Sequence, residues 1–129
     1  MTKPNKPTTA ELEILDILWE LGPSTVRDVH TVIDRRRPTA YTTVLKQMQI
    51  MHAKGLVRRT EKGKAHVYRP AFSQQQTQTG LVADLLERAF RGSALKLVQH
   101  VLETKPATPQ ELAEIRRLIK EAEERGPKK

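Results

Sequence analysis

The sequence contains no cysteine, few aromatic residues and no long apolar run. Without cysteine the chain can form no disulfide, thiolate metal site or thiol nucleophile, which fits a reducing compartment. Its two Phe, two Tyr and one Trp are too few for the aromatic platform on which single-stranded RNA stacks. No segment approaches the roughly 18 apolar residues of a membrane span, and the polar opening lacks the features of a signal peptide. We therefore expect a cytoplasmic protein.

Residue patterns typical of catalysis are missing as well. The four histidines are dispersed, without a His-Glu-x-x-His motif or another metal-ligand spacing. No glycine-rich phosphate loop occurs, and the three serines stand where helix caps are expected. The sequence therefore predicts no enzyme activity, no metal site and no cofactor.

Positive charge is concentrated in one part of the chain. The net charge is +8. Residues 35–69 hold ten Lys and Arg against one acid, Glu61, a local charge of +9, so the remaining residues sum to −1. Scattered solubilising lysines would not cluster in this way, so the segment points to an anionic partner.

Local signals predict two helices at the start of the chain. Thr8 and Glu11 have capping-box spacing, and apolar residues then recur every three or four positions as far as Gly22. Ser24 or Thr25 caps a second helix, which ends before the next proline.

A third helix is predicted from near Thr39 to Gly55, because glycine suits the left-handed position that stops a helix. At about 100° per residue its side chains divide into two faces. The inward face carries Ala40, Val44, Met48 and Met51. The opposite face, which is free to read a ligand, carries Thr39, Thr42, Thr43, Lys46 and Gln49.

Two short strands, 56–59 and 65–69, follow this helix and are separated by a turn at 61–64 in which Gly63 supplies a positive φ. Three helices followed by a basic hairpin are the order of a winged helix-turn-helix. We therefore predict an N-terminal arm at 1–7 and a winged helix-turn-helix DNA-binding domain at 8–71.

Helix-capping patterns then predict three more helices, over a dimerisation region at 72–125 that is followed by a basic tail at 126–129. The expected fold is mainly α. So short a region carries more apolar surface than it can bury, so it either binds a second copy or packs back on the winged helix. We favour the homodimer. The predicted interface residues are Leu81, Leu85, Leu86, Phe90, Leu95, Val98, Val101, Leu102, Leu112, Ile115, Leu118 and Ile119.

The third helix and the wing supply the predicted contacts to double-stranded DNA. Threonine and lysine can bond base edges in the major groove, although the alternative is that they are ordinary helix-start and surface residues. The predicted base-reading residues are Thr39, Thr42, Thr43, Lys46 and Gln47. Phosphates attract basic side chains without regard to base sequence. Tyr41 either contacts a phosphate as well or lies at the edge of the core. The predicted phosphate contacts are Arg37, Tyr41, Arg58, Arg59, Lys62 and Lys64.

Four segments together resemble one known family. They are TAELEIL at 9–15 with Leu18 and Trp19, TVRDV at 25–29, AYTTVL at 40–45, and KGLVRR at 54–59 leading to GKAHVYRP at 63–70. The sequence resembles the penicillinase-repressor (BlaI/MecI) family of winged-helix transcriptional repressors, from Thr9 to about Glu124. The resemblance implies a dimeric repressor that covers a promoter operator, reads bases with the third helix and dimerises through the C-terminal helices.

The resemblance also implies a link to a membrane sensor with a zinc-protease domain, which leads to cleavage of the repressor. The cleaved bond would fall at His100–Val101, where the β-lactam-resistance members have asparagine and phenylalanine. In the third helix, Lys46 and Ile50 replace a threonine and an arginine common in the family. We therefore expect an operator different from that of the best-known members.

A winged helix can also serve as a protein-interaction module without sequence-specific DNA binding. The placement of charge favours DNA, because the +9 segment covers the third helix and the wing, which face DNA in this fold.

Overall fold

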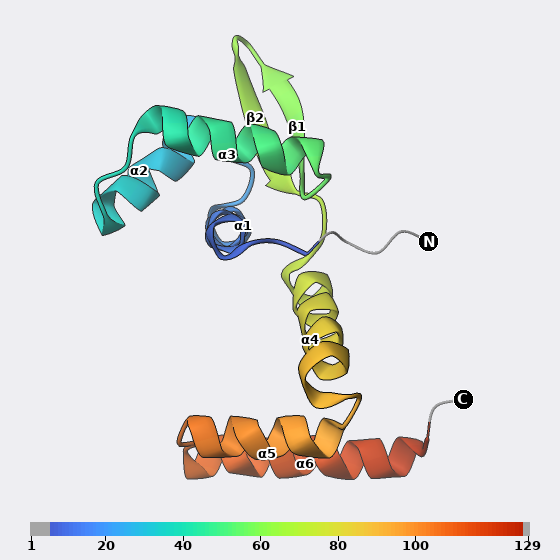
Figure 1. The fold of residues 1–129 in the computed structure, drawn as a ribbon. Helices are drawn as coiled ribbons and strands as arrows, with labels where there is room; N and C mark the ends of the chain where they lie inside the picture. The colour runs from blue at the N-terminus through green and yellow to red at the C-terminus, as the bar shows by residue number, and fades with distance from the viewer. Residues whose placement is uncertain (1–5, 128–129) are drawn as a thin grey trace. The chain divides into compact units, whose positions relative to one another are not determined.

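The computed structural model describes residues 6–127, which form six α-helices and one two-stranded antiparallel sheet (Figure 1). The elements in chain order are α1 (Thr9–Leu21), α2 (Val26–Arg36), α3 (Tyr41–Ala53), β1 (Val57–Lys62), β2 (Ala65–Pro70), α4 (Gln74–Phe90), α5 (Ala94–Thr104) and α6 (Pro109–Arg125). The predicted, mainly α fold is confirmed. The chain divides into two compact units between Asp84 and Leu85, inside α4.

Reciprocal caps fix the starts of α1 and α2. The Glu11 amide donates to Thr8 Oγ1 at 3.2 Å, and the Thr8 amide donates to Glu11 Oε1 at 2.9 Å. Thr25 and Asp28 form the same arrangement, so Thr25 caps α2. Ser24 instead forms a β-bridge with Tyr68, with backbone hydrogen bonds in both directions, which ties the segment before α2 to β2.

The core of the first unit lies among α1, α2, α3 and the base of the hairpin. Its buried side chains are Ile14, Leu15, Ile17, Leu18, Val26, Val29, Ile33, Val44, Met48, Met51, Leu56, Val57 and Tyr68. Ala40, predicted to point inward, is exposed. It is the N-cap of α3 with extended dihedral angles (φ −69°, ψ 141°), so the helical projection does not apply to it.

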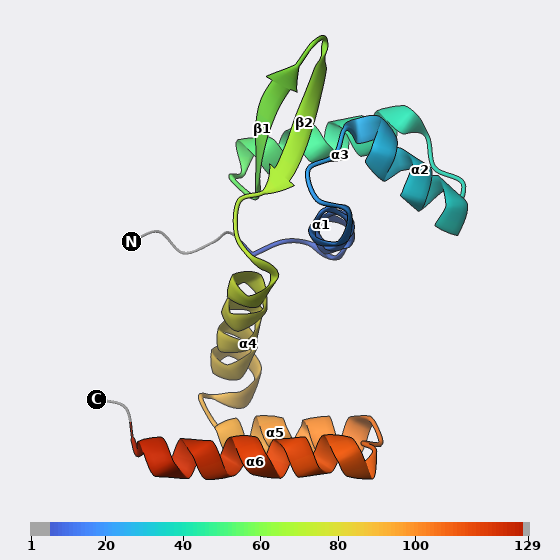
Figure 2. The same cartoon turned by 180° about the vertical axis from the view of Figure 1, so that it is seen from behind.

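The hairpin, called the wing below, closes with a two-residue turn at Gly63 and Lys64, since Lys62 pairs with Ala65. The four-residue turn predicted at 61–64 was therefore wrong, and both strands are longer than expected. Gly63 has φ +64°, the positive value that a turn of this kind requires at its first position. In Figures 1 and 2 the wing extends beyond α1, α2 and α3.

Beyond Thr77 no described residue is buried, although α4, α5 and α6 are well-formed helices. Ser73 and Gln76 form a reciprocal cap before α4, and Thr108 caps α6. Large exposed hydrophobic side chains on these helices are Val82, Leu85, Leu95, Val98, Val101, Leu102, Leu118 and Ile119. Within residues 6–127, no helix is both long and apolar enough to cross a membrane.

Candidate nucleic-acid interface

Helix α3 has one face buried in the core and one face open to solvent. The open face of α3 consists of Thr42, Thr43, Lys46, Gln49 and Ile50, all exposed. The helix starts without a side-chain cap, because Ala40 has no side chain that could accept a hydrogen bond. The Thr43 amide donates to Ala40 O at 3.1 Å, so the amides of Tyr41 and Thr42 are the ones left for an anion, at the positive end of the helix dipole.

Thr39 does not lie on this helix, contrary to the prediction. Its hydroxyl donates to Arg37 O at 2.8 Å, and its amide donates to Asp34 Oδ1 at 2.9 Å. Both bonds hold Thr39 in the connection between α2 and α3. We therefore leave it out of the base-reading set.

Tyr41 lies in a small cluster at the start of α3. Its ring meets the edge of His30, with ring centroids 5.6 Å apart, and the Arg27 guanidinium carbon lies 5.9 Å from the Tyr41 centroid. His30 Nε2 donates to Thr39 O at 2.7 Å. The cluster places the positive charge of Arg27 beside the open end of α3. Sequence reasoning missed Arg27, because the pattern of α2 alone gave no sign of a contact to the next helix.

Gln47 and Lys54 face α1 instead of solvent. Lys54 Nζ lies 2.7 and 2.9 Å from the two carboxylate oxygens of Glu11, which is only 1% exposed, and the half-buried Gln47 amide donates to Glu11 at 3.4 Å. Burial raises the pKa of Glu11, but the bonds from Lys54 and from the Thr8 amide outweigh burial and lower it overall. Gln47 thus anchors α3, and we remove it from the base-reading set.

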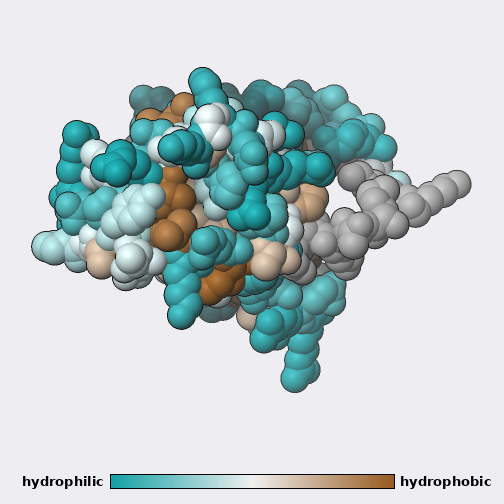
Figure 3. Space-filling view, turned by 90° about the horizontal axis from the view of Figure 1, so that it is seen from above, coloured by the Kyte–Doolittle hydropathy of each residue, from teal (hydrophilic) through white to brown (hydrophobic). Residues whose placement is uncertain are grey.

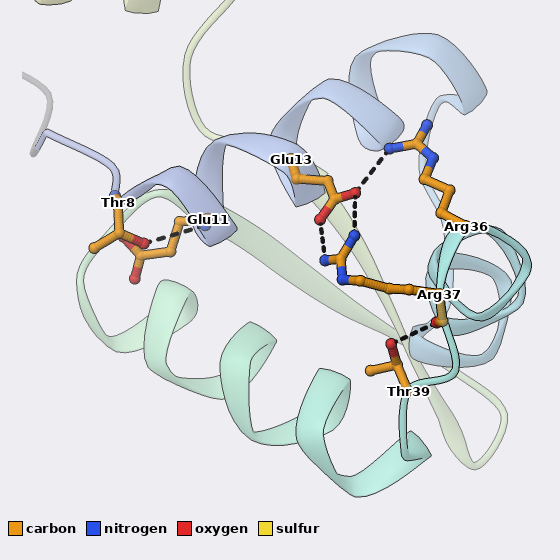
Figure 4. A network of polar contacts seen from close by, with 6 residues as sticks. All are labelled: Thr8, Glu11, Glu13, Arg36, Arg37 and Thr39. Atoms are coloured by element: carbon orange, nitrogen blue, oxygen red, sulfur yellow. Dashed lines mark hydrogen bonds and ion pairs between the residues drawn. The ribbon is translucent and has the colours of Figure 1, made fainter.

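Arg37 is held in an ion pair of the first unit (Figure 4). Its guanidinium donates to both carboxylate oxygens of Glu13, and Arg36 donates to the same carboxylate at 3.0 Å. The bond from Arg37 is the main reason that the pKa of Glu13 falls to about 2. Because this charge is already paired, we no longer count Arg37 among the phosphate contacts. Glu11 and Glu13 of α1 form ion pairs with residues of the basic segment 35–69. When these two carboxylates are counted with the segment, its net charge falls from +9 to +7.

The wing presents its cations in a defined order. Arg58 pairs with Arg69 across the strands, and Lys62 lies on the same face because alternate residues of a strand point the same way. Arg59 lies on the other face, opposite Tyr68. Arg58, Arg59, Lys62, Lys64 and Arg69 are all exposed. Like charges placed directly across two strands repel each other, and a phosphate between them would relieve that cost.

Arg69 was missed as a candidate contact because the turn was predicted two residues too long. Assigning the turn to Gly63 and Lys64 alone would have paired Arg69 with Arg58 from the sequence.

Seen from above the wing, the surface is mostly hydrophilic, with hydrophobic areas that are small and separate (Figure 3). This composition suits a charged, hydrated partner such as DNA. The described residues hold no cluster of side chains that could bind a metal ion.

The fold of the first unit is that of a known DNA-binding domain. The solution structure of the DNA binding domain of the repressor BlaI matches with a TM-score of 0.52 at 20% identity, covering 59% of this chain and 93% of that chain. The prediction of a winged helix-turn-helix is thereby confirmed.

Sequence comparison gives the family. The transcriptional regulator BlaI of Mycobacterium tuberculosis, in strains CDC 1551 / Oshkosh and H37Rv, is 34% identical over 125 residues, which is 95% of this chain and 89% of the relative. The pattern of the penicillinase repressor family matches residues 7–121. The chain belongs to the penicillinase repressor family. It is a DNA-binding transcriptional repressor and not an enzyme.

Proposed function

We propose that two copies of the chain associate through their C-terminal helices and hold two winged helices on a two-fold operator, which blocks transcription from a promoter in the cytoplasm. The observation that carries this proposal is the exposure of the apolar side chains on α5 and α6. Leu95 is 77% exposed, Val101 55% and Leu118 55%. Water-exposed apolar surface of this extent marks an interaction site, and a second copy offers the same surface in return.

Individual predicted interface residues differ in how much surface they offer. Leu86, Phe90, Leu112 and Ile115 are half-buried, so part of each side chain already packs within the second unit. Leu81 lines a groove of the first unit with Leu12 and Trp19 of α1. We therefore build the proposed interface around Leu85, Leu95, Val98, Val101, Leu102, Leu118 and Ile119.

In the proposed complex, the open face of α3 enters the major groove, where Thr42, Thr43 and Lys46 bond to base edges. Phosphate contacts come from both ends of this surface. Arg27, Tyr41 and the uncapped amides bind at the start of α3. Arg58, Arg59, Lys62, Lys64 and Arg69 bind from the wing.

A charge placed in the apolar stripe tests the dimer. We expect Leu95→Glu to shift the full-length chain from dimer to monomer in sedimentation and to weaken operator binding in parallel, because the carboxylate would be buried without a partner. Lys96→Glu is the matched control, since it places the same group on the neighbouring polar side of α5 and should leave the dimer intact. A monomeric wild-type chain at micromolar concentration would overturn the proposal.

We further propose the link to a membrane zinc-protease sensor that the family resemblance implies. His100 and Val101 lie inside α5, and the His100 ring packs on Phe90 with centroids 5.5 Å apart. A protease would reach this bond only after α5 has opened locally. Incubation of the intact chain with the sensor, followed by mass determination of the fragments, tests the link.

A further inference from the structure

Ile50 is an apolar side chain on a face that otherwise carries polar groups. It is 40% exposed, while its neighbours on the open face of α3 are Lys46, one turn earlier, and Thr43, two turns earlier. The core side of the same helix is filled by Val44, Met48 and Met51. Ile50 therefore exposes apolar surface on the face of α3 that carries the proposed base contacts.

The exposed surface of Ile50 is small and isolated. On α1, α2 and α3 the other large exposed hydrophobic side chains are Leu21 and Tyr41, and neither belongs to the open face of α3. A partner protein needs a continuous apolar patch, which this face lacks. A single apolar group with polar neighbours matches a ligand that has one apolar group among hydrogen-bonding ones.

The thymine edge in the major groove has that character. It presents the C5-methyl group beside the O4 acceptor, and no other base has an apolar group there. Isoleucine is also stiff, because a β-branched side chain in a helix has one strongly preferred χ1 rotamer, so little entropy is lost on contact. We propose that Ile50 reads the 5-methyl group of a thymine, next to the base that Lys46 contacts. This inference rests on the proposed docking of α3 in the major groove.

The test removes only the methyl group. A duplex that binds the full-length repressor is first selected from a random library, and each thymine is then replaced in turn by deoxyuridine, which lacks the methyl group. We expect one thymine per half-site to be sensitive, so that its replacement by deoxyuridine weakens binding about fourfold. This factor corresponds to the loss of about 0.8 kcal/mol for one buried methyl group. Replacing the equivalent thymine in both half-sites should weaken binding by about 15-fold.

The Ile50→Ala variant decides which residue reads the methyl group. Alanine keeps the helix but removes the side chain beyond Cβ. For this variant the same deoxyuridine replacement should change binding by less than 1.5-fold, because the contact is already lost. The control is Leu21→Ala, which removes an exposed apolar side chain from α1 and should retain the full fourfold effect.

Each result has a defined meaning. A deoxyuridine effect that Ile50→Ala removes and Leu21→Ala retains supports the inference. A deoxyuridine effect that persists in Ile50→Ala overturns the inference. A selected operator at which no deoxyuridine replacement weakens binding overturns it as well. In both cases the proposed function stands. Selection that yields no preferred sequence overturns the proposed operator binding itself.

Discussion

Glu13→Gln should destabilise the first unit in a pH-dependent way. Glutamine keeps the size of the side chain but removes the charge that holds Arg36 and Arg37. The fall of the Glu13 pKa from 4.5 to about 2 corresponds to about 3 kcal/mol. The arginine side chains are 44% and 56% exposed, so solvent screening reduces the expected loss to about 1–2 kcal/mol.

The sign of the pH dependence follows from the lowered pKa. A carboxylate whose pKa is lower in the folded state than in the unfolded state stabilises the folded state at any pH above the unfolded pKa. The stabilisation is lost as the pH falls towards the folded pKa. The difference between wild type and Glu13→Gln should therefore be full at pH 7 and should shrink between about pH 4.5 and pH 2.

Urea denaturation of both chains at equal concentration, at pH 7 and pH 3, measures this difference, provided that the denaturant slope is unchanged. Glu20→Gln is the matched control, since Glu20 is an exposed glutamate of the same helix, and it should change stability by less than about 0.5 kcal/mol. A loss for Glu13→Gln that is equally large at both pH values would refute the assigned role of the ion pair.

Three further changes test the DNA surface and the second unit. Lys62→Gln combined with Lys64→Gln should weaken binding to every duplex. Anisotropy titrations over a salt series should show that the slope of log K against log salt becomes shallower by about 0.9 for each lost phosphate contact. An unchanged slope would exclude these contacts. Lys46→Ala should cost about 1–3 kcal/mol on the selected operator and far less on random duplex, and equal losses on both would contradict base reading. A chain that ends at Asp84 keeps the first unit and should sediment as a monomer with much weaker operator binding; undiminished affinity would show that the C-terminal helices do not contribute.

Local signals in the sequence were sufficient to predict most of the helices. The caps at Thr8, Ser73 and Thr108 each bond to an amide three residues later, so the signal and its partner lie within one turn. The periodicity of α3 also placed Val44 and Met48 in the core. These features depend on spacings of three or four residues, which a single sequence contains in full.

What the sequence could not predict were contacts between distant segments. Glu13 is 24 residues away from Arg37, and Gln47 is 36 residues away from Glu11. Nothing in the charge pattern of residues 35–69 indicates that two carboxylates from α1 neutralise part of it. The roles of the exposed residues on α3 and the wing remain predictions, because exposure makes a contact accessible without identifying the partner.

The separation of anchors from exposed side chains on α3 has a practical consequence for altering DNA preference. Glu11 secures the helix through Gln47 and Lys54, which are not among the residues of the open face. Residues of that face can therefore be exchanged for those of another family member without loosening the scaffold. A library randomised at positions 42, 43, 46 and 50 should yield mostly folded variants with new target sequences.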